Sequence, residues 1–145
     1  MSFRLACDLP DRIAAIGPVA AADGTLFCGR DRAVPVIALN GTEDVLVNYT
    51  IAAASVESWA QANGCSLESD VVYEQGDVIC KSYAECGPEG ESVLCTVDEG
   101  GHTWPGAIDL MALDPEQYPW AGKTTQNLDG SAAIWEFFSR HHLRD

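Results

Sequence analysis

The sequence predicts an α/β fold in which a mainly parallel sheet is flanked by helices. Short apolar runs bounded by turn residues alternate with stretches of helical periodicity, which is the order of elements that builds such a sheet. The apolar runs are continuous rather than alternating, as in strands that are covered on both faces. The chain has 145 residues, of which 47% are apolar, so we expect residues 1–145 to form a single domain around one core.

The N-terminal part of the chain predicts a helix followed by two buried strands. Residues 2–9 are expected to be helical because their apolar residues recur near helical spacing, and Pro10 ends the run. Residues 13–20 are short, apolar and bounded by turn residues, which predicts a strand. A loop rich in Gly, Asp and Arg is expected over residues 21–34. Residues 35–41 then predict a second strand of the same buried type.

Two longer helices are predicted further along the chain. One is expected over residues 49–63, where Gly64 ends it. The other is expected over residues 129–142, with Asp129 as its N-terminal cap. Both carry apolar residues at helical spacing that we expect to face the core. In the first these are Ile51, Ala54, Val56, Trp59 and Ala62, and in the second Ile134, Trp135, Phe137 and Phe138.

The remaining strands lead to the candidate site. Strand pieces are expected over residues 71–83, and residues 92–98 predict the last strand. In parallel sheets, reactive groups lie beyond the carboxyl ends of the strands, and here Asp44 and His102 follow two of the predicted strands. An aspartate followed by a histidine is the order in which α/β-hydrolases complete a Ser-Asp-His triad. The plainer interpretations are a turn or helix cap for Asp44 and a structural role for His102.

Charge and hydropathy exclude several classes of partner. With 22 acidic and 8 basic residues the formal charge is −14, which repels nucleic acid and anionic membrane surfaces. No apolar run approaches the roughly 20 residues that a membrane span needs. The N-terminus also lacks the basic region and apolar core of a signal peptide. We therefore expect neither nucleic-acid nor membrane partners.

Six cysteines are many for a chain of this length. They stand at positions 7, 28, 65, 80, 86 and 95, and no close Cys-x-x-Cys pair suggests a zinc site. Structural disulfides are the favoured interpretation, with buried free thiols as the alternative. Disulfides imply export to an oxidising compartment, although the chain carries no export signal.

Several segments resemble one family of secreted esterases. NGTEDVLVNY (40–49) and GGHTWPG (100–106) resemble the aspartate and histidine loops of the polyhydroxybutyrate depolymerase and feruloyl or acetylxylan esterase family. FRLACDLPDRIAAIGPVA, WAQANGC and IWEFFSRH are similar to that family's helix and strand after the nucleophile, its helix after the aspartate, and its terminal helix. The resemblance implies a partial α/β-hydrolase fold, with Asp44 as the orienting carboxylate and His102 as the general base and acid.

The nucleophile of that family is absent from the sequence. No Gly-x-Ser-x-Gly motif occurs, and Ser2 lies on a predicted helix rather than on the strained turn that exposes a nucleophile. The chain therefore looks like the C-terminal half of such an enzyme, without its N-terminal strands and oxyanion hole. The upstream half would also supply the export signal, so the parent protein is expected to be secreted or periplasmic.

The resemblance also suggests a disulfide pairing and a pocket. It implies a Cys65–Cys86 bridge; Cys80 and Cys95 would pair if they lie on adjoining strands, leaving Cys7 with Cys28. Trp104 and Tyr49 are candidates for the wall of the ester pocket, although packing of their side chains is the alternative for both. The implied chemistry needs no metal and no organic cofactor.

Three functional hypotheses remain open at this stage. The first is a serine ester hydrolase that acts on a polyester or a plant-wall ester. The second is a catalytically inactive fragment that self-associates, as a homo-oligomer, through an exposed sheet edge. The third is a secreted polysaccharide-binding module, against which the helical spacing of most aromatic residues argues.

Overall fold

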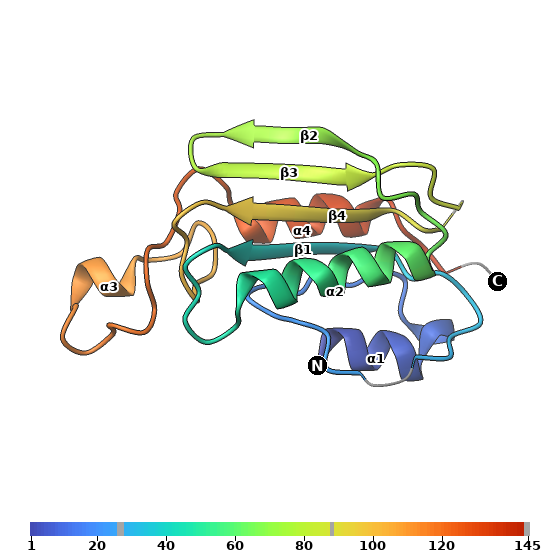
Figure 1. The fold of residues 1–145 in the computed structure, drawn as a ribbon, viewed down its shortest axis with the longest axis horizontal. Coiled ribbons are helices and arrows are strands. Elements are labelled where there is room, and N and C mark those ends of the chain that lie inside the picture. Colours follow the sequence, from blue (N-terminus) through green and yellow to red (C-terminus); the bar gives the residue numbers. More distant parts are fainter. Residues whose placement is uncertain (26–27, 88, 144–145) are drawn as a thin grey trace.

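The computed structural model describes residues 1–25, 28–87 and 89–143, which contain one four-stranded sheet with helices on both of its faces (Figure 1). The strands are β1 (Val36–Gly41), β2 (Ser69–Gln75), β3 (Val78–Tyr83) and β4 (Ser92–Val97), in the spatial order β1-β4-β3-β2. The helices are α1 (Ser2–Asp8), α2 (Tyr49–Ala62), α3 (Leu110–Leu113) and α4 (Gly130–Ser139), with a 3₁₀ turn at Pro10–Arg12.

The sheet is mixed, so the prediction of a mainly parallel sheet flanked by helices was wrong. Only β1 and β4 pair in parallel, whereas β3 runs antiparallel to both β4 and β2. The reason is the turn at Gly76 and Asp77, which is too short for a parallel crossover and makes β2 and β3 a hairpin. Gly76 has φ +56°, which favours glycine. Apolar periodicity reports burial and not strand direction, so it could not distinguish the two arrangements.

Residues 13–20 lie along β1 without forming the predicted strand. Two isolated parallel bridges join Ile16 to Val36 and Val19 to Leu39. Pro18 interrupts the ladder because it has no N–H to donate, although its carbonyl oxygen accepts from Leu39 N–H. The segment extends the sheet edge without being a regular strand. The loop expected over residues 21–34 is irregular where it is described, and residues 26–27 lie outside the described part.

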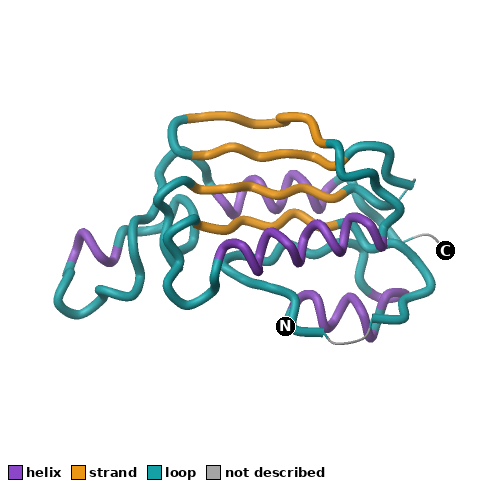
Figure 2. The backbone as a smooth tube through the Cα atoms, viewed as in Figure 1, coloured by secondary structure: helices purple, strands orange, loops and turns teal. Residues whose placement is uncertain are grey.

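Two layers of apolar side chains flank the sheet. Along β1, Val36 and Ala38 point to the face covered by α1 and α2, whereas Ile37 and Leu39 point to the face covered by α4. Figure 2 shows the helices on the two sides of the strands. All six residues of β1 are buried, as expected for a strand covered on both faces. None of the helices in the described residues combines the length and apolarity needed to cross a bilayer.

The helices form where the sequence predicts them, but their buried faces differ in part. In α2, Val56 and Trp59 are buried as predicted, whereas Ile51 is 60% exposed. In α4, Ile134 and Phe137 are buried, but Trp135 is 71% exposed. Neighbouring helix positions lie about 100° apart, so a residue next to a core position faces solvent when only one side of the helix is covered. Asp129 caps α4 by accepting the N–H of Ala132, and α4 ends at Ser139 rather than at residue 142. The short helix α3 was not predicted.

All six cysteines form disulfides, which confirms the prediction of a disulfide-bonded chain. The pairs are Cys7–Cys28, Cys65–Cys86 and Cys80–Cys95. Cys65–Cys86 is the bridge that the resemblance implied, and the other two were expected on the condition that Cys80 and Cys95 lie on adjoining strands. Cys80 and Cys95 are register partners on β3 and β4, so this bridge joins neighbouring strands. Cys65–Cys86 joins the end of α2 to the segment after β3. Together, the three bridges are consistent with an oxidising extracellular environment.

Substituting Phe137 in α4 should destabilise the protein far more than substituting Trp135. Phe137→Ala removes a ring that is 1% exposed and is expected to lower the free energy of unfolding by about 4 kcal/mol. Trp135→Ala is the matched control on the same helix and should change it by less than about 1 kcal/mol. Urea unfolding followed by circular dichroism measures both. Equal losses in the two variants would contradict the packing of α4 described above.

Candidate active site

Asp44 and His102 lie at the same edge of the sheet because their strands are parallel neighbours. The register pairs Gly41, the last residue of β1, with Val97, the last residue of β4. The two strands therefore end side by side, as the arrows of Figure 1 show. Asp44 lies on the loop that follows β1, and His102 on the loop that follows β4. Residues that are far apart in the sequence are thus brought to one place by strand pairing.

A hydrogen bond joins the two side chains. Nδ1 of His102 lies 2.9 Å from Oδ2 of Asp44. The Asp44 side chain is 2% exposed, whereas that of His102 is 31% exposed. An ionised carboxylate can only accept, so the proton of the neutral imidazole is on Nδ1 and Nε2 is unprotonated. The imidazole therefore presents a proton acceptor toward solvent while its other nitrogen is held.

The second oxygen of Asp44 holds the carboxylate in place. Oδ1 accepts the backbone N–H groups of Leu46 and Val47, each at 2.8 Å. These bonds satisfy a buried charge that would otherwise be costly to desolvate. Asp44 thus forms a turn with its own loop and also orients His102. The turn interpretation of Asp44 and its expected pairing with His102 therefore do not exclude each other, because each uses a different carboxylate oxygen.

Close backbone contacts fix the histidine loop against its neighbours. A Cβ atom on Gly41 would lie 2.2 Å from the carbonyl oxygen of Gly100, and one on Gly101 would lie 2.1 Å from that of Ala121. Neither approach tolerates a side chain, so glycine is required at both positions. Glu43 N–H also donates to the Gly100 carbonyl oxygen at 2.9 Å. The loop that carries Asp44 and the loop that carries His102 therefore form one rigid unit.

The segment around Lys123 supports the histidine loop from the other side. Its carbonyl oxygen accepts the N–H of Gly101 at 2.9 Å and the hydroxyl of Thr103 at 3.3 Å. Its ammonium group forms ion pairs with Asp77 at 3.1 Å and with Glu99 at 3.5 Å. Residues on both sides of His102 are thus tied to one segment of the chain.

Asp77, in the turn between β2 and β3, anchors that supporting segment. Its carboxylate accepts a short hydrogen bond from the Thr125 hydroxyl and another from Asn127 Nδ2 at 2.9 Å. Burial disfavours the charged form, but these two bonds and the Lys123 ammonium outweigh it and lower the pKa of Asp77 to about 2. Sequence reasoning placed Asp77 only within the strand pieces expected over residues 71–83, because no local pattern reveals bonds to residues so distant in the chain.

An open cavity lies beside His102. Its volume is about 200 Å³, and it is lined by Val19, Ala20, His102, Thr103 and Trp104. Trp104 is 45% exposed and donates its indole N–H to the hydroxyl of Ser131 at 3.1 Å, which fixes the orientation of its ring. Trp104 is therefore both a structural residue and a wall of the cavity. Tyr49 is not among the described residues that line this cavity. Its hydroxyl is hydrogen-bonded to that of Thr96 at 2.7 Å.

In the described part of the chain, Nε2 of His102 has no hydrogen-bond or ion-pair partner. The only hydrogen-bond partner of the His102 ring among these residues is Asp44, through Nδ1. Ser2, the serine considered as a substitute nucleophile, is the first residue of α1. Over residues 1–25, 28–87 and 89–143, no three His, Cys, Asp or Glu side chains gather into a group that could hold a metal ion.

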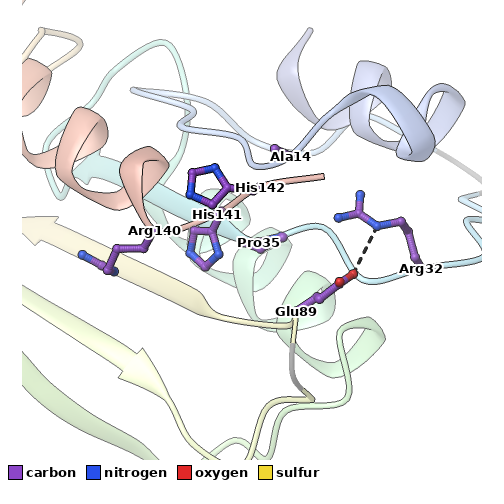
Figure 3. Close-up of a pocket in the computed structure, with 7 residues that line it drawn as sticks. All are labelled: Ala14, Arg32, Pro35, Glu89, Arg140, His141 and His142. Atoms are coloured by element: carbon purple, nitrogen blue, oxygen red, sulfur yellow. Dashed lines mark hydrogen bonds and ion pairs between the residues drawn. The ribbon is translucent and has the colours of Figure 1, made fainter. Parts of the chain in front are cut away.

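A second cavity, of about 240 Å³, lies at the opposite end of α4 and gathers basic residues (Figure 3). Its charged side chains are occupied by partners. Arg32 pairs with Glu89 at 3.3 Å, while Arg140 and His141 both contact Glu91, at 2.8 and 2.9 Å. The two contacts with Glu91 hold the C-terminal end of α4 beside the residue that precedes β4. The cavity contains no pairing of a histidine with a buried carboxylate like that of His102 with Asp44.

Asp44→Asn should remove the signature of the bond to His102. The proton on Nδ1 of His102 lies against a buried carboxylate, so it is expected to give a strongly downfield proton resonance in NMR spectra. In Asp44→Asn this resonance should disappear or move upfield, because the charged acceptor is gone. Glu43→Gln, at an exposed neighbouring position, is the control and should preserve it. A signal unchanged in Asp44→Asn would contradict the pairing.

Asp77→Asn should destabilise the protein at neutral pH but not in strong acid. Because the folded-state pKa of Asp77 is lowered to about 2, its carboxylate stabilises the fold above its ordinary pKa near 4. That contribution is lost as pH falls from about 4 to 2. The variant should lose about 2 kcal/mol at pH 7, and this difference should shrink toward pH 2. Urea unfolding at several pH values tests it, with exposed Asp70→Asn expected to show no such difference.

Comparison with known proteins supports a relationship to esterases. No family model matches the chain. Over 142 residues it is 28% identical to feruloyl esterase D of Neurospora crassa, and the match covers 97% of this chain and 44% of that protein. The chain thus spans less than half of the length of this curated relative. The similarity extends across the whole candidate site, from the segment along β1 to α4, and is consistent with an ester hydrolase.

Proposed function

We propose that this chain carries the aspartate and the histidine of a Ser-Asp-His triad in a carboxylic ester hydrolase. The observation that carries the proposal is the 2.9 Å bond between His102 Nδ1 and the buried carboxylate of Asp44. It leaves Nε2 as the free base beside an open cavity. A histidine with a purely structural role would not need a ring nitrogen without a hydrogen-bond partner beside an open cavity. The similarity to an esterase supports the same reaction class.

In this mechanism His102 moves protons and Asp44 orients it. Nε2 of His102 takes the proton of the serine hydroxyl as its oxygen attacks the ester carbonyl. The tetrahedral intermediate collapses, the ester bond breaks, and His102 returns the proton to the departing alcohol. A water molecule then attacks the acyl-serine while the same histidine takes a proton from it. The bond from the acyl carbon to the serine oxygen breaks, His102 returns the proton to that oxygen, and the acid is released. Asp44 stabilises the imidazolium ion that forms in each step.

The nucleophile and the oxyanion hole would come from outside this sequence. No Gly-x-Ser-x-Gly motif occurs in it, and no described side chain is hydrogen-bonded to Nε2 of His102. The chain matches only part of its curated relative, which is compatible with the remaining catalytic groups lying on a preceding half. The parent enzyme is proposed to be secreted, since all six cysteines are in disulfides.

The cavity suggests an acyl group that is flat or extended. Trp104 presents a fixed indole beside the catalytic base, and such a ring stacks well on an aromatic or unsaturated acyl chain. The relative's name specifies a feruloyl ester. The segments 40–49 and 100–106 also resemble the corresponding loops of polyhydroxybutyrate depolymerases. We therefore propose plant-wall esters or polyesters as the substrate class.

The decisive experiment compares the chain alone with a version extended upstream. The extended polypeptide, taken from genomic DNA until it includes a Gly-x-Ser-x-Gly motif, is expected to hydrolyse p-nitrophenyl acetate. Asp44→Asn should lower its kcat on the order of 10⁴-fold, as expected when the orienting carboxylate is lost. His102→Ala should abolish the activity, whereas Glu43→Gln should not change it. Activity that survives in both Asp44→Asn and His102→Ala would refute the triad.

The chain by itself should show only background hydrolysis, equal in the wild type and in His102→Ala. Turnover that depends on His102 would mean that this sequence contains its own nucleophile, contrary to the proposal.

An inactive, self-associating fragment is the second candidate, favoured by the exposed edge strand β2, in which Val71 and Val72 are 53% and 57% exposed. It predicts concentration-dependent association in sedimentation experiments and an inactive extended polypeptide.

A further inference from the structure

Two Asn-x-Thr sequences, the acceptor motif for N-linked glycans, lie close together around the aspartate loop. They are Asn40-Gly41-Thr42 and Asn48-Tyr49-Thr50. Both satisfy the sequence requirement equally, because neither has proline in the middle. The structure distinguishes them by the surroundings of the two asparagine side chains.

Asn40 cannot carry a glycan in the folded protein. It lies in β1, is 3% exposed, and its side-chain oxygen accepts the N–H of Ala21 at 3.0 Å. Its amide nitrogen, the atom to which a glycan would be attached, is fully buried. The next residue is Gly41, which contacts the histidine loop through its backbone. A sugar on Asn40 would therefore separate β1 from the elements that cover it.

Asn48 has the opposite surroundings. It is the exposed N-cap of α2, and its side-chain oxygen accepts the N–H of Ile51 at 3.3 Å. Its amide nitrogen has no hydrogen-bond partner among the described residues. Thr50, which completes the motif, is also exposed. Attachment at the nitrogen leaves the oxygen free to cap the helix, so modification and folding are compatible.

The surface around Asn48 is unusually apolar for an exposed loop and helix start. Val45, Leu46 and Ile51 are 72%, 58% and 60% exposed. They flank the asparagine on both sides in sequence, and Ile51 is also joined to it by the capping hydrogen bond. Exposed apolar side chains that gather on a surface promote association between protein molecules. A bulky polar glycan at this position would cover them.

We infer that Asn48 is a site of N-linked glycosylation and that Asn40 is not. In the reaction, the Asn48 amide nitrogen attacks the anomeric carbon of an oligosaccharide carried by a polyprenyl diphosphate. The bond from that carbon to the diphosphate oxygen breaks, the nitrogen loses a proton, and the lipid diphosphate leaves. Three disulfides are consistent with passage through the oxidising compartment in which this transfer takes place. The inference does not depend on the proposed esterase function.

Secretion from yeast behind a cleavable signal peptide tests the inference. Intact mass before and after treatment with peptide-N-glycosidase is expected to show one glycan. Peptide mapping should place it at residue 48, because the enzyme converts the glycosylated asparagine into aspartate. Thr50→Ala removes the motif but keeps the helix cap, and it should abolish the glycan. Thr50→Ser keeps the motif and should retain it.

Each outcome of the secretion experiment either supports or overturns the inference. A secreted, disulfide-bonded chain without a glycan, or with one on Asn40 instead, would overturn the inference. Because transfer precedes folding, Asn40 is also accessible at that moment, so the site is assigned on the secreted, disulfide-bonded protein, in which a glycan on Asn40 would prevent β1 from packing. The Thr50→Ala protein is further expected to bind more of an apolar-surface dye than the glycosylated Thr50→Ser protein. Equal dye binding would show that the glycan does not cover Val45, Leu46 and Ile51.

Discussion

The parallel pairing of β1 with β4 is the constraint on which the candidate site depends. It makes both strands end at the same edge, and it brings the backbone after Gly41 against Gly100 at a distance that excludes any side chain. Asp44 follows Gly41, and His102 follows Gly100, after only a short segment of loop. Contact between these two glycines therefore brings the two side chains close together. The bond between them is thus a consequence of main-chain packing and needs little additional ordering of flexible side chains.

Supporting interactions then limit how far the imidazole can move. Asp44 is held by two backbone N–H groups from its own loop, and the histidine loop is held by the carbonyl oxygen of Lys123. The Lys123 side chain is in turn fixed by Asp77, whose lowered pKa keeps it charged down to strongly acidic conditions. The orientation of one nitrogen atom therefore depends on three segments that are distant in the sequence. Such layered support is typical of catalytic groups.

The mixed sheet places the antiparallel hairpin where it stabilises this arrangement. β3 pairs with β4 on the side away from β1, and the turn of the hairpin supplies Asp77. The Cys80–Cys95 bridge joins β3 to β4 directly. The hairpin was the main departure from the predicted parallel sheet, and it is also the element that anchors the loop of His102. The sequence did not reveal the β2–β3 hairpin, and this explains both the error in the predicted sheet and the missed role of Asp77.

The sequence by itself determined several local features. These are the strands β1 and β4 from their continuous apolar runs, the presence of α1, α2 and α4 with the Asp129 cap, and Asp44 and His102 as the residues that follow two strands. It also indicated the disulfides, because six cysteines without metal-ligand spacing favour them. Only the tertiary structure decided strand direction, the exposure of Ile51 and Trp135, and the network around Asp77 and Lys123. The physical reason is that periodicity and capping are properties of neighbouring residues, whereas pairing direction, burial and long-range hydrogen bonds depend on which elements meet in space.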